Sequence, residues 1–424
     1  MKALLQRVKN VANDRVTRIL FYDQTLKKGY ASLAQFPKLF IFRRLLITLI
    51  AYPLSLFCWI FLVVLNLFTP VRIYRFERPQ RPGFASVYIA QLEPLCRELQ
   101  EKNNKGFFIF IDASETTNLE LLKLYATHFN LYLDDRVAFI RTIFALCPKA
   151  GINNSKQEYS IYDTNWELPP ARNLRNSEFD VIPDVLSDLD LKKNNFVIIA
   201  YPSISYYKKR LVGEYTDLSR FQNQTNNLDA MRLLIKQGFK LVRLGLDTDP
   251  LEPVFKELKV IDLSGNSHSD DNDLWLYKNC FFSWSMGGVG TWHFAHKFDR
   301  PSLMTETYGH CYGYQANLYT RKLVWDKYQK RLLTFSEMLT KGLDRVSTME
   351  QRGLSFIDGT PLQICRAVEE MIAVETNTFD YSKGNLALLT RYDQISLISH
   401  KPKRKTRHSR LCISFLEEHE ELLC

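Results

Sequence analysis

The sequence predicts an α/β fold, in which helices cover both faces of a parallel β-sheet. From Asn195 onward, apolar runs of strand length alternate with stretches of helix length, about one strand–helix pair every 20 to 30 residues, which is the pattern of βαβ units. The runs Phe107–Ile111 and Phe196–Tyr201 are continuously apolar, as is typical of strands buried on both faces. Apolar residues make up 46% of the chain and aromatic residues 13%, which suits sizeable cores and excludes wholesale disorder.

In the first half of the chain we expect a strand at 71–76, a helix at about 85–100 and a strand at 107–111. The last of these strands ends at Asp112, and hydroxyl side chains a few residues later can cap the next helix. In the second half, strands are predicted at 196–201, 239–244, 259–264, 280–284 and 302–307. Helices are predicted at 228–236, 253–258, 271–279 and 291–298, and C-terminal helices at 333–346 and 360–375.

Composition divides the chain into four parts: 1–69, 70–180, 181–375 and 376–424. The first is a basic leader followed by a hydrophobic segment, and the last is an extension with the basic stretch HKPKRKTRHSR. The two central parts are α/β units. The eight cysteines form no CxxC pair, so they indicate neither a zinc ribbon nor a redox motif, and they are typical of buried thiols in a reducing compartment.

Residues 45–69 form a run of 25 residues without a charge, long enough to span a bilayer as a helix. Arginines flank the run on both sides, so the positive-inside rule does not orient it. Pro53 is compatible with a kink or with a segment that enters and leaves the same leaflet. The run therefore predicts a membrane-associated segment, and the alternative is a buried helix of a globular domain. The basic leader suits an anionic lipid surface or simple solvation.

Three glycines lie within four positions between the predicted strand at 280–284 and the helix at 291–298. Ligands of open parallel sheets bind outside the carboxyl ends of the strands, where this loop lies. Free backbone N–H groups at a helix start favour an anion such as a pyrophosphate, and glycine allows close approach. The alternative is a tight turn whose glycines relieve crowding. The candidate anion-binding residues are Ser283, Ser285, Gly287, Gly288, Gly290 and Thr291.

Arg243 lies near the end of the predicted strand at 239–244. From this position an arginine side chain can reach the same edge of the sheet and form charge-assisted hydrogen bonds with a diphosphate. The alternative is an arginine at a strand end that contacts solvent or a carboxylate.

Three stretches together resemble a bacterial glycosyltransferase family of surface-polysaccharide loci. They are PVRIYRFERPQRPGFASVYIAQLEPL, RFQNQTNNLDAMRLLIKQGFKLVRLG and CFFSWSMGGVGTWHFAHKFDRPSLM, and the resemblance extends over roughly residues 70–375. It implies two Rossmann-like domains that face each other across a cleft, the GT-B arrangement, with the acceptor on 70–180 and the nucleotide sugar on 181–375.

The resemblance further implies transfer of a sugar from a nucleotide-activated donor to a polysaccharide or lipid-linked acceptor. The nucleotide sugar is the donor substrate, and neither a separate cofactor nor a metal ion is expected. The reaction would take place at the cytoplasmic face of the bacterial inner membrane, held there by residues 45–69. An inverting transfer needs a general base, for which we expect Asp112, with Asp217 and Glu214 as second choices. His310 is a candidate contact to the nucleotide.

Two departures from the family pattern favour an alternative function. Tyr201, Pro202 and Ser203 stand where the family usually has an Arg-Asp pair, and Pro82-Gly83-Phe84 replaces its usual Gly-His element. The alternative is a catalytically inactive protein of the same fold that binds or assembles components of a polysaccharide system. A nucleic-acid partner is not expected, because the basic tail carries no base-stacking motif and anionic lipid explains it equally well.

Overall fold

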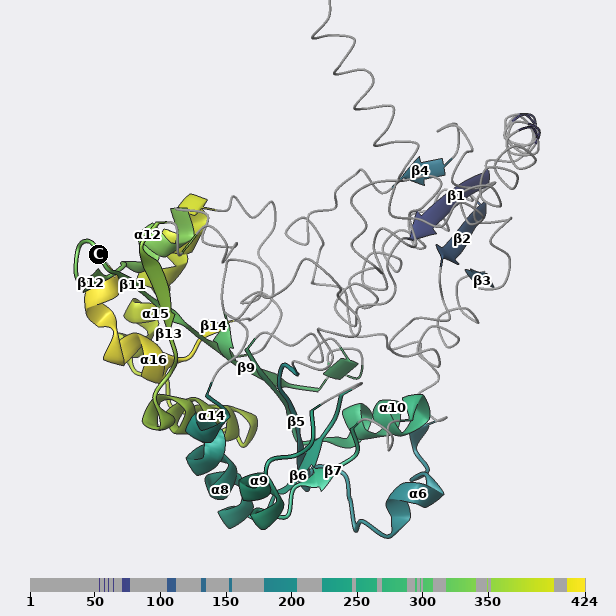
Figure 1. Ribbon diagram of the computed structural model, residues 1–424, viewed down its shortest axis with the longest axis horizontal. Helices are drawn as coiled ribbons and strands as arrows, with labels where there is room; N and C mark the ends of the chain where they lie inside the picture. The colour runs from purple at the N-terminus through teal and green to yellow at the C-terminus, as the bar shows by residue number, and fades with distance from the viewer. Residues whose placement is uncertain are drawn as a thin grey trace, which may run out of the picture. The chain divides into compact units, whose positions relative to one another are not determined.

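The structure is a computed structural model, and it describes the backbone of four strands before residue 160 and most of the chain after residue 178 (Figure 1). The described residues are 71–76, 105–111, 131–134, 152–154, 179–203, 223–245, 249–264, 269–287, 300–307, 318–340, 352–399 and 410–423, with a few isolated positions. The chain divides into two compact units, Met1–Tyr159 with Tyr206–Thr216 and Ser160–Ser205 with Asp217–Cys424. The finer division at 69, 180 and 375 stays a prediction.

The first unit contains a four-stranded parallel sheet in the order β3-β2-β1-β4. Its strands are β1 Val71–Phe76, β2 Lys105–Ile111, β3 Leu131–Asp134 and β4 Ile152–Asn154. The two strands predicted from the sequence here, at 71–76 and 107–111, are confirmed. Asp112, the predicted general base, follows β2 directly but lies outside the described residues.

The second unit is built on a seven-stranded sheet in the order β14-β10-β9-β8-β5-β6-β7, and every pairing is parallel. Its strands are β5 Phe196–Ala200, β6 Lys240–Arg243, β7 Ile261–Asp262, β8 Ser283–Met286, β9 Ser302–Thr307, β10 Leu318–Arg321 and β14 Arg410–Leu411. The five strands predicted for this half are therefore present, and the α/β class with a parallel sheet is confirmed.

Strand β5 shows why the sheet is covered on both faces, since all its side chains are buried. Val197 and Ile199 belong to the large hydrophobic cluster that contains Met231 of helix α8. Phe196 points to the opposite face, where its ring stacks on Trp275 of helix α10 at 6.1 Å between centroids. Successive side chains of a strand alternate between faces, so a continuously apolar strand requires two apolar layers.

The helices predicted at 228–236, 253–258, 271–279 and 360–375 are present as α8, α9, α10 and α14, with α8, α9 and α14 on one side of the sheet and α10 on the other (Figure 1). The helix predicted at 85–100 and most of the one predicted at 291–298 lie outside the described residues. Their bounds are α6 Asp184–Ser187, η5 Gln224–Asn227, α8 Leu228–Lys236, α9 Pro253–Glu257, α10 Asp270–Asn279, α12 Phe335–Thr340, α14 Pro361–Glu375, α15 Lys383–Ser399, α16 Ile413–Glu418 and η7 Glu420–Leu422. Helix α14 begins with a capping box, in which Thr360 and Gln363 each bond to the other's backbone N–H.

A second, antiparallel sheet was not predicted from the sequence. It consists of β11 Leu323–Asp326, β12 Arg331–Leu332 and β13 Leu354–Ile357 in the order β12-β11-β13. Its strands are at most four residues long and interspersed with polar residues, so their periodicity is too weak to recognise. Between β12 and β13 the sequence predicted a helix at 333–346; the described part of this range contains α12, and residues 341–346 lie outside the described residues.

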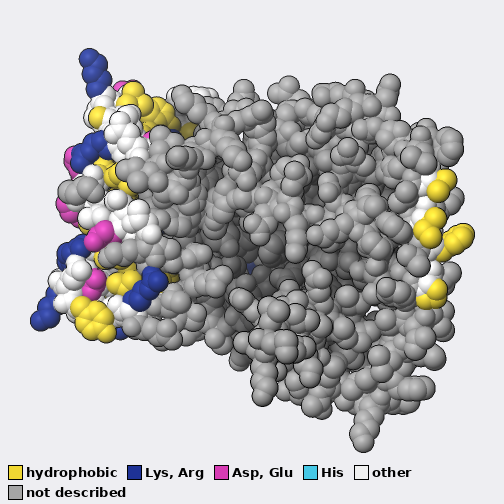
Figure 2. All heavy atoms as spheres, turned by 90° about the horizontal axis from the view of Figure 1, so that it is seen from above, with side chains coloured by type: hydrophobic (Ala, Val, Ile, Leu, Met, Phe, Trp, Pro, Cys, Tyr) yellow, Lys and Arg dark blue, Asp and Glu magenta, His cyan; other side chains and the backbone are white. Residues whose placement is uncertain are grey.

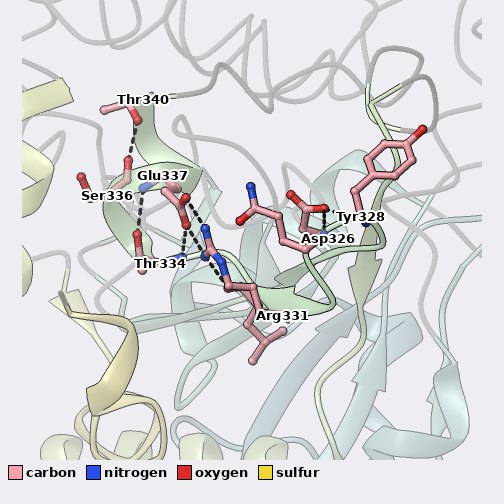
Figure 3. A network of polar contacts seen from close by, with 9 residues as sticks. Asp326, Tyr328, Arg331, Thr334, Ser336, Glu337 and Thr340 are labelled. Carbon is pink, nitrogen blue, oxygen red and sulfur yellow. Dashed lines mark hydrogen bonds and ion pairs between the residues drawn. The ribbon is translucent and has the colours of Figure 1, made fainter.

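Helix α12 is fixed to this sheet by a network of charged and hydroxyl groups (Figure 3). Thr334 and Glu337 form a capping box, with N···O distances of 2.9 and 3.2 Å. Arg331 of β12 donates hydrogen bonds from both terminal nitrogens of its guanidinium group to the Glu337 carboxylate, at 2.7 Å each. A bidentate pair of this kind is among the stronger charge-assisted contacts, and it holds the helix start against the sheet.

Residues 410–423, which the sequence placed in a C-terminal extension, contribute β14 and α16 to the second unit. The buried carboxylate of Glu370 in α14 anchors them: it accepts hydrogen bonds from Arg410 at 2.5 Å, the Ile413 N–H at 3.0 Å and the Ser414 N–H at 3.1 Å. Backbone N–H groups at the start of α16 lack partners within that helix, and Glu370 satisfies two of them.

In the described part of the chain, no helix is long and apolar enough to cross a bilayer. The predicted membrane segment, residues 45–69, lies outside that part except for four isolated helical positions, Pro53, Phe57, Ile60 and Val64, which are all exposed. The membrane association of this segment therefore stays a prediction.

Candidate functional site

The order of the seven strands creates a topological switch point. From β5 the chain adds β6 and β7 on one side, and then returns to add β8, β9 and β10 on the other. Loops that leave the carboxyl ends of β5 and β8 therefore diverge in opposite directions. In open α/β sheets the crevice that forms at such a point is the usual ligand site. Strand β8, which leads into the predicted glycine loop, is one of the two strands at this point.

Gly287 begins the loop after β8 in a left-handed backbone conformation, with φ at +61°. Its N–H donates to the Thr305 carbonyl of β9 at 2.9 Å, so the chain turns where the sheet ends. A residue with a Cβ is strained at this φ, which explains glycine here whatever the ligand. Three further predicted loop residues, Gly288, Gly290 and Thr291, lie outside the described residues, as does His310.

Ser283 and Ser285, predicted as hydroxyl donors to an anion, are fully buried within β8. The side chains of a strand alternate, so the two serines share one face and Trp284 the other. The indole N–H of Trp284 donates to the Thr305 hydroxyl at 3.0 Å and ties β8 to β9. The serine hydroxyls thus lie inside the sheet layers, and their contact with an anion stays a prediction.

Arg243, the predicted phosphate ligand, is 1% exposed and already has protein partners. Its guanidinium donates to the Asp262 carboxylate of β7 at 3.0 Å and to the Asp249 carbonyl at 2.6 Å. It also lies over the ring of Tyr201, with 4.7 Å between Cζ and the ring centroid. The structure therefore gives Arg243 a role in joining the loops after β5 and β6 to β7, and its contact with a nucleotide stays a prediction.

The segment Tyr201–Ser203 follows β5 at the switch point. Burial raises the pKa of the Tyr201 phenol to about 12, so the group stays neutral at physiological pH. Ser203 donates its hydroxyl proton to the Asp249 carboxylate at 2.9 Å and accepts the Asp249 N–H at the same distance. Through these hydrogen bonds Ser203 joins the loop after β5 to the loop after β6.

A buried carboxyl group that sequence reasoning missed lies on the next strand. Glu306 is the second-last residue of β9, and its side chain is 1% exposed. Its φ is +56°, a region that L-residues rarely adopt. The pairing of β9 with β10 shifts register at this point, and the Glu306 N–H donates to the Thr320 hydroxyl at 3.0 Å. The irregularity places a glutamate, rather than an apolar residue, inside the carboxyl edge of the sheet.

One carboxylate oxygen of Glu306 accepts a hydrogen bond, and the other has no partner among the described residues. Oε1 accepts the Gly359 N–H at 2.6 Å, just before helix α14 begins. Oε2 is buried and accepts no hydrogen bond within the part of the chain that the structure describes. Such atoms are rare in native proteins, because burying a polar group without a partner is unfavourable.

Lys322, a cation that acts on Glu306, is already paired. Lys322 bonds to the Asp358 carboxylate at 2.6 Å, and the Lys322 side chain is 1% exposed. The other oxygen of Asp358 accepts the Asn223 N–H at 3.2 Å, and the Gly359 carbonyl accepts from the Asn226 side chain at 2.9 Å. Segments separated by up to 135 positions in the sequence thus meet around Glu306.

Burial raises the pKa of Glu306 to about 7, while Lys322 and the Gly359 N–H oppose the shift. A carboxyl group with this pKa is present in both protonation states near neutral pH. It can therefore act as a hydrogen-bond donor or as a proton acceptor, which an ordinary glutamate at pH 7 cannot. In the sequence, the only sign of this group is one acidic residue within the otherwise uncharged run SLMTET.

Figure 2 shows basic and acidic side chains interspersed on the part of the surface that the structure describes. Among the described residues, no three His, Cys, Asp or Glu side chains gather as metal ligands, and the expected independence from metal stays a prediction. The second choice for a catalytic base, Asp217, lies outside the described residues together with Glu214.

No family model and no curated protein matches the chain. The likeness to a glycosyltransferase family therefore rests on the quoted stretches of sequence alone.

Proposed function

We propose that the protein is a glycosyltransferase that moves a sugar from a nucleotide-activated donor to a polysaccharide or lipid-linked acceptor at a membrane. The observation that carries the proposal is the position of Gly287, a left-handed glycine at the carboxyl end of β8, at the switch point of a parallel sheet. The Gly287 N–H is used by Thr305, so in this proposal the phosphate oxygens are bound by backbone N–H groups of the residues that follow, where glycine leaves room for them.

In this proposal the diphosphate of the donor lies at the carboxyl edge of the seven-stranded sheet, beside β8. Backbone dipoles there stabilise the negative charge that develops as the nucleoside diphosphate leaves the sugar. The general base that activates the acceptor hydroxyl is assigned to Asp112, on the first unit, with Asp217 as the second choice. The membrane segment, residues 45–69, would bring a lipid-linked acceptor to the enzyme at the cytoplasmic face of the bacterial inner membrane.

The test is binding of nucleoside diphosphates, measured by thermal shift and then by calorimetry with uridine, guanosine and thymidine diphosphates. A ligand that binds the folded state raises its melting temperature. The Gly287→Ala variant is expected to weaken binding at least about tenfold, because the new Cβ strains the turn from which the proposed phosphate-binding loop begins.

The matched control for this variant is Gly238→Ala. Gly238 also has a positive φ, +91°, and a Cβ added there meets no atom within 4 Å. It precedes β6 and so lies at the opposite, amino edge of the sheet. Both variants place a Cβ at a positive φ, so equal losses of binding in the two would contradict a diphosphate site at Gly287.

A second candidate function, an inactive binding or assembly protein, is favoured by one observation. The guanidinium of Arg243 is occupied by Asp262 and Asp249, so a cation expected to serve the donor serves the fold. Incubation with a panel of nucleotide sugars and polysaccharide or lipid-phosphate acceptors separates the two. Binding of a nucleotide without release of nucleoside diphosphate from any sugar donor would favour this candidate over the transferase.

A further inference from the structure

Residues 410–423 pack on helices α14 and α15 (Figure 1) and are attached to α14 at two places. Glu370 accepts hydrogen bonds from the residues that begin α16, and Gln363, about two turns earlier on the same face of α14, contacts the residues that end it. Several apolar side chains of the segment enter the large hydrophobic cluster: Leu411, Phe415, Leu416, Leu422 and Leu423. The second attachment involves a titratable ring.

That ring belongs to His419, which directly follows α16 and is 7% exposed. Its imidazole packs edge-on against the Phe415 ring, with 4.7 Å between centroids. The imidazole Nε2 lies 2.9 Å from Nε2 of the Gln363 amide. One of these nitrogens therefore donates a hydrogen to the other, and the orientation of the amide decides which one.

The other neighbours of Gln363 fix the orientation of its amide. Oε1 accepts the Thr360 N–H at 2.9 Å, as part of the capping box of α14, and Nε2 donates to the Glu418 carboxylate at 2.7 Å. A backbone N–H only donates and a carboxylate only accepts, so a flipped amide would lose both contacts. The second hydrogen of the amide therefore goes to His419, whose Nε2 accepts it. The imidazole is neutral in this arrangement and carries its one hydrogen on Nδ1.

The charges around His419 oppose its neutral form, but burial outweighs them. Burial lowers the pKa of the imidazole below its usual value, whereas the carboxylates of Glu418 and Glu421 raise it. The helices packed against α16 contribute two cations, and both already pair with carboxylates of the segment. Arg366 of α14 lies 3.7 Å from Glu418, and Arg391 of α15 bonds to the first residue of η7 at 2.6 Å.

We propose that the contact between His419 and Gln363 is a proton-sensitive attachment, which holds the end of α16 on α14 while the imidazole is neutral and releases it when the imidazole takes up a proton from solvent. A protonated imidazole has a hydrogen on both nitrogens, so Nε2 would face the amide donor to donor. Glu370 keeps its bonds to Arg410 and to backbone N–H groups, so the release is confined to the end of α16 and to η7. The inference does not depend on sugar transfer.

The sign of the pH dependence follows from the lowered pKa of His419. The released segment binds a proton more readily than the attached one, so attachment is complete above pH 6.5, the usual pKa of histidine, and weakens as the pH falls below it. Glu306 titrates in an overlapping range with the opposite effect on stability. Glu306 is common to all the variants compared below, so the differences between them report on His419.

The experiment is amide hydrogen exchange of the full chain at pH 7.5, 6.5 and 5.5, measured by mass spectrometry and corrected for the exchange rates of the same peptides when unfolded. In the wild type we expect protection within residues 415–423 to fall roughly fivefold between pH 7.5 and 5.5, the effect of losing one hydrogen bond. Protection of α8 should not fall, because this helix carries no part of the attachment.

Three variants distinguish this attachment from a general effect of acid. His419→Gln has a carbonyl oxygen that accepts the Gln363 amide at every pH, so the fall should be absent. Gln363→Glu keeps a capping residue in α14, and its carboxylate accepts a hydrogen bond from the protonated imidazole, so protection should rise on acidification. Gln237→Glu, the same change of charge at an exposed position beyond α8, is the matched control and should behave as the wild type.

An equal fall in the wild type and His419→Gln, or no fall in the wild type, would overturn the inference. So would a loss of protection in α8 as large as that in residues 415–423, which would indicate unfolding of the whole unit. A direct measurement decides the matter even where His419→Gln does not fold. In the wild type with ¹⁵N-labelled histidine, the NMR signals that Gln363→Glu shifts should show the hydrogen on Nδ1 at pH 7.5, and a hydrogen on Nε2 would refute the proposed contact.

Discussion

Replacement of Glu306 by glutamine tests whether this carboxyl group is neutral in the folded protein. The pKa rises from 4.5 to about 7 on folding, because the side chain is desolvated and only partly compensated. Each pKa unit corresponds to 1.36 kcal/mol, so ionised Glu306 lowers the free energy of unfolding by about 3 kcal/mol at high pH. The folded state binds a proton that the unfolded state has released between pH 4.5 and 7. The stability of the wild type therefore falls with rising pH in this window and levels off above it.

Glutamine is neutral at every pH, so this dependence is absent from the variant. The free energy of unfolding of Glu306→Gln relative to wild type should rise by about 2.5 kcal/mol between pH 5 and pH 8. The amide has a donor in place of one oxygen, which adds a pH-independent offset of about 1–2 kcal/mol if that donor stays unpaired. Only the change with pH, and not the offset, tests the protonation state.

The assay is urea unfolding at pH 5, 6, 7 and 8, followed by tryptophan fluorescence. Trp284 is a suitable reporter, since it is fully buried and bonds to Thr305 beside Glu306. Glu369→Gln, an exposed position on α14, serves as the control and should track the wild type at all four pH values. A difference between Glu306→Gln and wild type that varies by less than 0.5 kcal/mol across the range, where about 2.5 is expected, would refute a neutral Glu306.

Three other substitutions test contacts of the second unit. Arg243→Ala should lower the free energy of unfolding by about 2–3 kcal/mol, since it removes the arginine that pairs with the Asp262 carboxylate, and it should weaken nucleotide binding ten- to a hundredfold. Urea unfolding measures the first effect and calorimetry the second, and a stable variant with unchanged affinity would contradict both roles. Gly353→Ala should cost about 1–2 kcal/mol because its φ is +69° and the new Cβ meets the Tyr328 ring at 2.3 Å, and thermal unfolding equal to wild type would argue against the left-handed turn. Glu370→Ala should lower the free energy of unfolding by about 3 kcal/mol and speed amide hydrogen exchange within residues 410–423, because Glu370 bonds to Arg410, Ile413 and Ser414. Exchange that accelerates equally throughout the second unit would show that Glu370 does not anchor this segment.

Much of the fold could be predicted because the relevant patterns are local. A strand buried on both faces needs an unbroken apolar run, and Phe196–Ala200 has one; a helix start needs a cap, and Thr360 with Gln363 supplies it. The strands of the antiparallel sheet were not predicted: they mix apolar with polar residues and gain their apolar surroundings from other parts of the chain. Length alone does not explain the difference, since β6 and β8 also have four residues and were predicted.

The candidate site was predicted only in part. The glycine at 287 was identified from its position between a strand and a helix, and the structure gives it the left-handed conformation that explains its identity. Arg243 was identified as a residue at the right edge of the sheet, but its partner Asp262 is 19 positions away and belongs to another strand. Nothing in the local sequence distinguishes an arginine that binds a ligand from one that binds a neighbouring strand.

By itself, the sequence determined the α/β class, five of the seven parallel strands of the second unit and the place where the chain turns at Gly287. The tertiary structure decided the strand order, which puts the switch point between β5 and β8, and it decided the chemistry of Glu306. The Glu306 carboxyl group bonds to the N–H of Gly359, 53 positions away, and it lies near the ion pair of Lys322 and Asp358, which are 36 positions apart. Hydrophobic periodicity encodes which segments form strands and helices, whereas burial and a pKa depend on groups that only the folded chain brings together.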